Sequence, residues 1–208
     1  MIRLLGKIPG EVHVAVSGGP DSMAAVDFLK RKHDVTVMHF HHGSEFGERA
    51  FKFVSEYCRD ENLTLVTEKI SRTKESKESP EEYWRNERYK WFNSFNFPIV
   101  TAHNLDDVVE WYIFSALHGN ARLVPYKNDN VIRPFLITPK SEFISWVERN
   151  NVPYMNDPAN EDRKYSRSIV RHDIMPHALK VNPGLYKVVK KMVMEENESI
   201  ISNQDPAM

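Results

Sequence analysis

The stretch VHVAVSGGPDS, residues 12–22, places a glycine-rich turn directly after a strongly apolar run. The apolar run predicts a buried strand, and the periodic residues that follow the turn predict a helix. Gly18 and Gly19 let the turn backbone approach a ligand closely, while a helix N-terminus offers unpaired amides with partial positive charge. Ser17 and Ser22 add hydroxyl groups. The stretch therefore predicts a turn that binds pyrophosphate, and the alternative is a strand-to-helix connector without a ligand.

The hexapeptide SGGPDS resembles the SGGxDS signature of the PP-loop ATP pyrophosphatases. It lacks the lysine and the spacing of the GxxxxGK[ST] loop, which serves transfer of a γ-phosphate. A loop that holds the β and γ phosphates of ATP together leaves the α-phosphate open to attack and makes pyrophosphate the leaving group. Adenylation is therefore the expected chemistry. The turn follows the first predicted strand, and α/β sheets bind nucleotides at the carboxyl ends of their strands.

Strand and helix patterns alternate along the first two thirds of the chain. Apolar runs predict strands over 12–16, 35–40, 63–70 and 98–102, and helical patterns predict helices over 23–32, 47–62, 80–95 and 105–117. Such alternation indicates an α/β protein with a doubly wound parallel sheet. We expect residues 1–138 to form an ATP-binding catalytic core. Residues 139–208 are expected to form a helical C-terminal segment, with helices over 139–150, 167–180 and 184–197.

Composition restricts the class of protein. The chain has 208 residues, 41% of them hydrophobic, which allows one buried α/β core rather than two full domains. Cys58 is the only cysteine, which excludes a disulfide framework, a cysteine zinc site and a cysteine-ligated iron–sulfur cluster within one chain. No run of about 18 apolar residues and no secretory leader is recognisable. We therefore expect a cytoplasmic protein without membrane contact.

Three histidines, His39, His41 and His42, lie at the end of the second predicted strand. Clustered histidines can bind zinc, but no carboxylate or cysteine lies at helical ligand spacing beside them. His39 follows the alternation of the apolar strand residues, which favours a buried strand histidine. His42 lies at the strand end, where it is better placed to line a nucleotide pocket.

Three acids begin the helix predicted after the fourth strand. Asp106 and Glu110 are four residues apart and share a helix face, while Asp107 points toward a neighbouring face. Acids in this position can simply stabilise the helix dipole. The presence of Asp21 favours a second role for these acids, which is binding of Mg²⁺. Asp21 and one of the three acids can share a Mg²⁺ ion with pyrophosphate, and we take Asp107 as that acid.

Two arginines, Arg85 and Arg88, lie three residues apart on one face of the helix predicted over 80–95. They can form surface ion pairs with the nearby glutamates. They can also direct their guanidinium groups at phosphate or at a substrate carboxylate.

The order of these blocks is similar to that in the catalytic domain of the tRNA(Ile)-lysidine synthetase family, over residues 10–183. The blocks are SGGPDS (17–22), HFHHG (39–43), EEYWRNERY (81–89), TAHNLDDVVE (101–110), RPFL (133–136) and NDPANEDRKYSRSIVRHDIMP (156–176). The resemblance implies an ATP site formed by Ser17, Gly18, Gly19, Asp21 and Ser22 and lined by His42, Arg85, Arg88, His103, Asp106, Asp107 and Glu110. It also implies that the motif closing the domain contains Asp157, Asn160, Arg167 and Arg171.

The resemblance implies a ligase that uses ATP, Mg²⁺ and free lysine. The O2 atom of the wobble cytidine of isoleucine tRNA attacks the α-phosphate, pyrophosphate leaves, and the ε-amine of lysine displaces AMP. Mg²⁺ and the loop amides stabilise the pyrophosphate, and Asp106 or Asp107 takes the proton from lysine. Two alternatives stay open: a PP-loop enzyme that adenylates another nucleobase or a small molecule, and a nucleotide-binding module without catalysis.

Several positions depart from the family pattern. Val108 and Trp111 replace the usual polar residue and threonine of the acidic helix, and Lys140 stands where arginine is common. The tRNA-binding C-terminal domains of the family have no counterpart in these 208 residues. We therefore expect tRNA contact through the basic segment after Glu161, through a homodimer or with a partner. From Glu161 to Met194 the chain has eight basic residues against three acidic ones, which fits either a polyanion contact or a solvated helix face.

Overall fold

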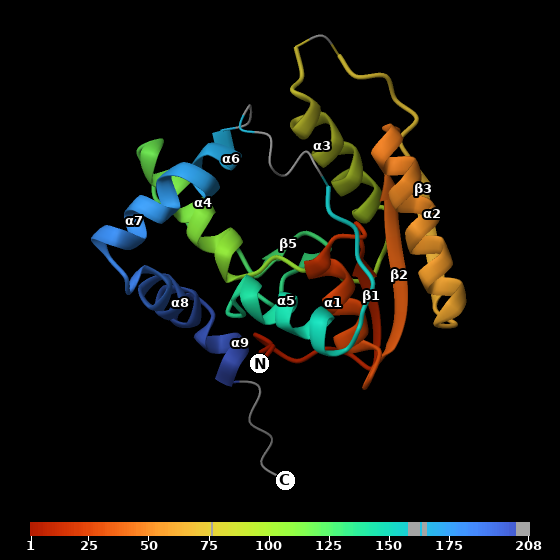
Figure 1. The fold of residues 1–208 in the computed structure, drawn as a ribbon, viewed down its shortest axis with the longest axis horizontal. Coiled ribbons are helices and arrows are strands. Elements are labelled where there is room, and N and C mark those ends of the chain that lie inside the picture. Colours follow the sequence, from red (N-terminus) through yellow and green to blue (C-terminus); the bar gives the residue numbers. More distant parts are fainter. Residues whose placement is uncertain (76, 158–162, 164–165, 203–208) are drawn as a thin grey trace.

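A six-stranded sheet forms the centre of the molecule in the computed structural model, which describes residues 1–75, 77–157, 163 and 166–202. The strand order is β3-β2-β1-β4-β6-β5, and all neighbours are parallel except the pair β5 and β6. The strands are β1 (Glu11–Ala15), β2 (Asp34–His41), β3 (Thr64–Lys69), β4 (Ile99–Val100), β5 (Lys127–Asn128) and β6 (Val131–Ile132). The predicted α/β fold with a doubly wound, mostly parallel sheet is confirmed (Figure 1).

The edge of the sheet beyond β4 differs from the prediction. Only Ile99 and Val100 form the ladder of β4, although the backbone N–H of Thr101 still donates to Ile132 (3.0 Å). The sequence YKNDN, residues 126–130, predicts a turn that leads into the apolar pair Val131 and Ile132. Asp129 does adopt the left-handed backbone of a tight turn (φ 52°), and short strands flank it on both sides. Strands of two residues are too short to leave a periodic signal.

A helix follows each of the first four strands. These helices are α1 (Pro20–Leu29), α2 (Glu45–Asp60), α3 (Pro80–Phe92) and α4 (Leu105–Leu117). Ser44 and Ser79 cap α2 and α3, because each side chain accepts a hydrogen bond from the N–H group three residues later (2.9 and 3.1 Å). Asn104 caps α4 in a capping box with Asp107. The four helices expected in this part of the chain are therefore confirmed.

Residues of neighbouring strands alternate between the two faces of the sheet. Val14 and Val37 are buried with the apolar sides of α1 and α2 on one face. Met38 and Ile99 are buried with Phe92 of α3 on the other face. Because both faces are covered, β2 is buried along nearly all of its length, which is typical of strands in parallel sheets.

The C-terminal helices pack against the first half of the chain. They are α5 (Lys140–Arg149), α6 (Ser166–Ile169), α7 (Met175–Val181), α8 (Leu185–Glu196) and α9 (Glu198–Ser202). Phe143 of α5 shares a core cluster with α1, and Val189 of α8 shares another with α4. The division of the chain after residue 138 stays a prediction. Within the described residues, no helix is both long and apolar enough to span a membrane.

The helix expected over 167–180 is interrupted. Between α6 and α7 the backbone forms a π-helical turn, η2 (Val170–Ile174). Pro176, at the start of α7, has no N–H group to continue the regular hydrogen-bond pattern. Single π turns within helices are frequent at functional sites. This turn carries Arg171, which contacts α4.

Candidate active site

The SGGPDS turn joins β1 to α1 in the centre of the sheet. Gly18 has a left-handed backbone (φ +88°), which a side chain would strain. The Ser22 hydroxyl donates to the carbonyl of Gly19 (3.0 Å) and accepts from the N–H of Ser17 (3.2 Å), which fixes the shape of the turn. In the part of the chain that the structure describes, no side chain caps the N-terminus of α1, so the first amides of this helix stay available to an anion.

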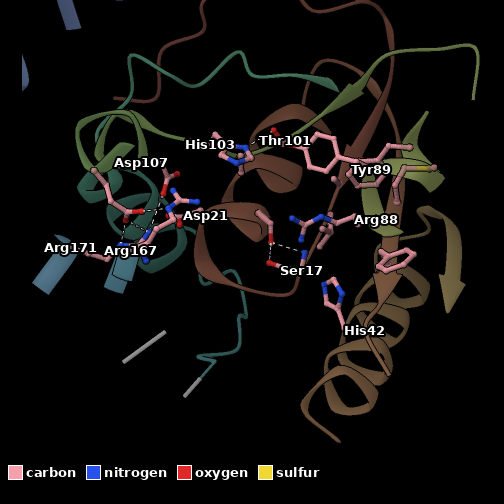
Figure 2. A pocket seen from close by; sticks show the side chains of 18 of the residues that line it. Ser17, Asp21, His42, Arg88, Tyr89, Thr101, His103, Asp107, Arg167 and Arg171 are labelled. Carbon is pink, nitrogen blue, oxygen red and sulfur yellow. Dashed lines mark hydrogen bonds and ion pairs between the residues drawn. The ribbon is translucent and has the colours of Figure 1, made fainter. Parts of the chain in front are cut away.

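A cavity of about 430 Å³ opens beside this turn. It lies at the carboxyl ends of β1, β2 and β4, where the order of the strands reverses, as expected for a nucleotide site in an open α/β sheet. Its lining residues are Ala15, Val16, Ser17, Asp21, Ser22, Met38, Phe40, His42, Arg88, Tyr89, Phe92, Thr101, Ala102, His103, Asp107, Glu110, Arg167, Ser168 and Arg171. Figure 2 shows acids and arginines on one side of Ser17, and His42, Arg88 and Tyr89 on the other.

Asp21 is a half-buried carboxylate whose hydrogen bonds are incomplete among the described residues. Its Oδ1 atom is buried and has no hydrogen-bond partner among the described residues. Its Oδ2 atom lies 3.7 Å from the ammonium group of Lys140. Burial raises the pKa of Asp21 to about 6, against the opposing effect of Lys140, and the negative charge of Asp107 raises it further. The unpaired Oδ1 atom of Asp21 is therefore suited to bind a cation that enters the cavity together with a bound ligand such as a nucleotide.

The two neighbouring aspartates of α4 point in different directions. Asp107 lines the cavity, where its Oδ1 accepts from Arg171 (3.3 Å) and its Oδ2 accepts from the N–H of Asn104 (3.0 Å). Asp106 does not line the cavity. Its oxygens accept from the N–H of Lys140 (2.7 Å) and from the hydroxyl of Tyr186 (2.9 Å). Asp106 therefore joins α4 to α5 and α8.

Glu110 carries a buried charge that two arginines of the C-terminal segment neutralise. Its side chain is only 1% exposed. Arg167 of α6 and Arg171 of η2 donate to its two oxygens at 2.7 and 2.6 Å. Glu110 lines the cavity as expected, but its oxygens are engaged by these arginines. Its negative charge therefore fixes two positive groups in the wall of the cavity (Figure 2).

The opposite wall contains cationic and neutral nitrogen groups. Within the described part of the chain, no carboxylate lies at ion-pair distance from Arg88, and burial lowers the pKa of this guanidinium. Burial lowers the pKa of His42 to about 3 and that of His103 to about 4, so both rings are neutral at pH 7. His103 pairs with the hydroxyl of Thr101 (2.8 Å), whereas the Nδ1 atom of His42 is buried without a hydrogen-bond partner among the described residues. These groups can hydrogen-bond a polyanion without bringing another negative charge.

The other two histidines of the cluster have separate partners. The Nδ1 atom of His39 contacts the carbonyl of Val16 (2.8 Å), so His39 is the buried strand histidine that the alternation predicted. His41 accepts from the N–H of Gly43 (2.8 Å) and pairs with Glu48 (2.9 Å). Within the described residues, no three histidine, cysteine, aspartate or glutamate side chains form a metal-binding group.

Some predicted site residues lie elsewhere, and some lining residues were not predicted. Arg85 is exposed, and its guanidinium lies 4.6 Å from the ring of Tyr89, outside the cavity wall. Asp157 also lies outside the cavity wall, and Asn160 falls outside the described residues. Tyr89 and Thr101 line the cavity but were not among the predicted site residues, although Tyr89 ends the block EEYWRNERY and Thr101 begins the block TAHNLDDVVE. Both lie at a helix end or strand end where only the folded sheet brings them to the turn.

The fold and the cavity together define a class of α/β nucleotide-binding protein with a glycine-rich phosphate loop after the first strand. Residues 6–178 match the family model described as the PP-loop domain. Because this match spans most of the chain, the protein belongs to the PP-loop domain family.

Its curated relatives narrow the comparison. The chain is 32% identical to tRNA(Ile)-lysidine synthase of Thermotoga maritima over 88% of its own length and 48% of that protein. It is 33% identical to the synthase of Pseudothermotoga lettingae over 85% of its own length and 44% of that protein. The resemblance drawn from the order of motifs is therefore confirmed. The chain spans about half the length of the curated relatives that it matches.

A solved structure confirms the fold at lower identity. The U34-tRNA thiolase NcsA from Methanococcus maripaludis, solved with its [4Fe-4S] cluster, superposes with a TM-score of 0.74 at 18% identity. The match covers 93% of this chain and 74% of the thiolase.

Proposed function

We propose that this chain is the catalytic part of an ATP-dependent, AMP-forming ligase that adenylates a cytidine of isoleucine tRNA and couples lysine to it. The observation that carries the proposal is the meeting of the SGGPDS turn with the acidic start of α4 in one cavity, where Asp21 and Asp107 lie together (Figure 2). The similarity to tRNA(Ile)-lysidine synthases supports the choice of acceptor.

The reaction has two steps. The cytidine O2 forms a bond to the α-phosphorus of ATP while the bond to the bridging oxygen breaks, and pyrophosphate leaves. The ε-amine of lysine then forms a bond to C2, the bond from C2 to O2 breaks, and AMP leaves with that oxygen. The lysine ammonium must lose a proton before it attacks. Asp107 is the acid of α4 that reaches the cavity, and in this proposal it takes that proton after pyrophosphate has left.

The turn and the facing wall bind the triphosphate. In the proposal the amides of Gly18 and Gly19 and the hydroxyls of Ser17 and Ser22 hold the β and γ phosphates at the start of α1. Arg88 is suited to the phosphates because it has no carboxylate partner within the described residues.

Asp21 and Asp107 would hold Mg²⁺. The orphaned Oδ1 atom of Asp21 supports this fit. Mg²⁺ in phosphoryl-transfer sites commonly takes one or two carboxylates and completes its shell with phosphate oxygens and water. When bound, the ion would supply charge stabilisation for the departing pyrophosphate.

Basic residues after Glu161 would contact the tRNA backbone. The charges of Arg167 and Arg171 are partly neutralised by Glu110. The attraction of the tRNA phosphates would therefore come mainly from the lysines of α7 and α8. These are Lys180, Lys187, Lys190 and Lys191. Contacts of this kind position a nucleic acid without reading its sequence. Dimerisation of the chain is the alternative route to the same contact.

The test is a reaction with ATP, Mg²⁺, lysine and isoleucine tRNA with a CAU anticodon. We expect pyrophosphate and AMP in solution, and a lysine-modified cytidine in the digested tRNA by mass spectrometry. Omission of lysine should abolish the modified nucleoside, and omission of tRNA should abolish pyrophosphate release. Pyrophosphate release that needs a small-molecule amine and ignores tRNA points to the other acceptor class. ATP binding without turnover points to a module without catalysis.

A paired variant tests the assignment of the site. Asp21→Asn should lower kcat by about 10²- to 10³-fold, as expected for loss of an electrostatic group that acts on the leaving charge. Asp34→Asn is the matched control, because Asp34 is an exposed aspartate at the start of β2. Equal rates for the two variants would contradict the proposed site.

A further inference from the structure

A row of aromatic side chains continues the active-site face of α4 toward the surface. Residues three or four positions apart lie on the same face of a helix. This spacing joins four residues along one face of α4: Asp107, Trp111, Phe114 and His118. We define Trp111, Phe114 and His118 as the aromatic row. It begins next to the cavity and extends to the end of α4, a length of about 16 Å from Asp107 at the helical rise.

The rings of the aromatic row follow one another along α4, with the first pair stacked and the second pair tilted. The centroids of Trp111 and Phe114 are 5.6 Å apart with an angle of 23° between the planes, and those of Phe114 and His118 are 4.4 Å apart with 35°. Trp111 and Phe114 are partly buried and His118 is exposed, so the row has accessible surface. The buried side of α4 is formed by Val108 and Val109, and Phe114 packs against the same core cluster, whereas Trp111 is not one of the residues of that cluster.

Charge around the aromatic row favours an anionic partner. Residues 111–128 contain no aspartate or glutamate and include Arg122 and Lys127. At the cavity end, Arg167 lies 5.8 Å from the ring of Trp111 while it also binds Glu110. The same arginine therefore contacts both the cavity wall and the first ring of the row.

We infer that the aromatic row is a stacking platform for unpaired RNA bases next to the base held in the cavity. The inference rests on the proposed function, because it takes RNA as the substrate whose target base must leave its stack. Unpaired bases are commonly recognised by stacking on aromatic side chains and arginine planes. Arg167 lies over the first ring of the row, and the backbone N–H of Arg122 donates to the hydroxyl of Ser115 in α4 (2.9 Å), so both arginines belong to this part of the molecule and suit the phosphates beside such bases.

The first experiment measures binding of a fluorescent RNA hairpin with a CAU loop to the full chain without ATP. Trp111→Leu should weaken binding by about 5- to 100-fold, which is the range for loss of one base–aromatic stack. Trp111→Phe should retain most of the affinity, because it keeps a ring. Thermal unfolding of both variants shows whether they fold.

The matched control is Leu117→Ala on the same helix. Leu117 is 62% exposed and apolar but has no ring, so its loss should leave RNA affinity unchanged. If this surface of α4 instead binds a second copy of the chain or another protein, Leu117→Ala should weaken that protein–protein contact as strongly as Trp111→Leu does. The oligomeric state of the two variants would then change to the same extent. That outcome overturns the inference.

Abasic substitutions in the RNA loop make the test specific to stacking. An abasic residue should weaken binding to the wild-type chain and have little further effect on Trp111→Leu, because both changes remove the same stack. Additive losses, or equal affinity of the wild-type chain and Trp111→Leu, overturn the platform but leave the adenylation reaction intact. Conversely, ring-dependent RNA binding without pyrophosphate release would refute the proposed reaction and retain the platform.

Discussion

Asp106 and Asp107 are adjacent in sequence and differ in role because of their hydrogen bonds. Asp107→Asn should lower the rate of pyrophosphate release by about 10²-fold or more with little loss of stability, since it removes a charge that faces the reacting groups. Asp106→Ala should lower the free energy of unfolding by about 1–3 kcal/mol, because it leaves the N–H of Lys140 and the hydroxyl of Tyr186 without their acceptor. Urea unfolding and single-turnover rates measure the two effects. Tyr186→Phe is the control, and it should recover part of the stability in the Asp106→Ala background.

Histidine burial predicts a pH dependence of stability. Burial lowers the pKa of His103 to about 4, whereas the unfolded chain has the ordinary value of about 6.5. As the pH falls, the unfolded chain therefore takes up this proton before the folded chain does. The contribution of neutral His103 to the free energy of unfolding is fully present above pH 6.5 and is lost as the pH falls toward 4. His103→Asn should reduce the slope of the free energy of unfolding against pH by up to about 1.4 kcal/mol per pH unit. His42→Asn should act in the same direction, because burial also lowers the pKa of His42.

The measurement is urea unfolding of the ligand-free protein at several pH values between 4 and 7. Asp21 acts in the opposite direction, since its pKa is raised to about 6 and its protonation favours the folded state. The comparison is therefore between the slopes of wild-type and variant protein, in which the Asp21 contribution cancels. Identical slopes would contradict the burial of these rings.

The residues of the phosphate turn were predictable, and most of their partners were not. Ser17, Gly18 and Asp21 are fixed by the strand and the helix on either side of one short turn. The contact between Asp21 and Lys140 joins residues more than a hundred positions apart, and the bonds of Asp106 join α4 to two later helices. Patterns of period two or 3.6 report which face a residue occupies, and they contain no information on which distant element covers that face.

At the scale of elements, the π-helical turn is the feature that couples the C-terminal segment to the site. A regular helix from α6 to α7 was predicted because helical periodicity does not distinguish an α turn from a π turn. In the structure, Arg167 and Arg171 both bind Glu110, one from before the π turn and one from within it. Only the placement of α4 opposite this segment defines that arrangement.

Removal of Glu110 should loosen this coupling. Glu110→Ala should lower the free energy of unfolding by about 1–3 kcal/mol, less than for a fully buried pair because both arginines are partly exposed. It should also speed tryptic cleavage in the segment over 166–174 and weaken ATP binding, since the arginines lose their position in the cavity wall. Limited proteolysis and equilibrium ATP binding measure these effects. Glu195→Gln on the exposed face of α8 is the control, and it should behave as wild type.

At the scale of the whole molecule, the sequence predicted the sheet and the helices around it more completely than the site. The strands β1 and β2, the glycine-rich turn before α1 and the Ser44 cap of α2 have strong local signals. The strand predicted over 98–102 is present as β4, whereas the short strand β6 is specified by its neighbour, because Val131 pairs with Ile99 and Ile132 with Val100. The cavity forms where these elements meet, so its lining combines predicted motifs with residues that only the assembled sheet brings together.

Binding of ATP with Mg²⁺ should stabilise the whole molecule. At a ligand concentration of about 100 times Kd, binding raises the free energy of unfolding by about 2.7 kcal/mol. For a chain of this size, that increase raises Tm by about 5–10 °C. ATP with EDTA should raise Tm much less, because Asp21 and Asp107 would then face the triphosphate without a shared cation. Thermal unfolding with each combination of ATP, Mg²⁺ and EDTA measures the effect, and Asp21→Ala is the informative variant. In that variant the difference between Mg²⁺ and EDTA should largely disappear, whereas a difference as large as in the wild type would place the cation on other ligands.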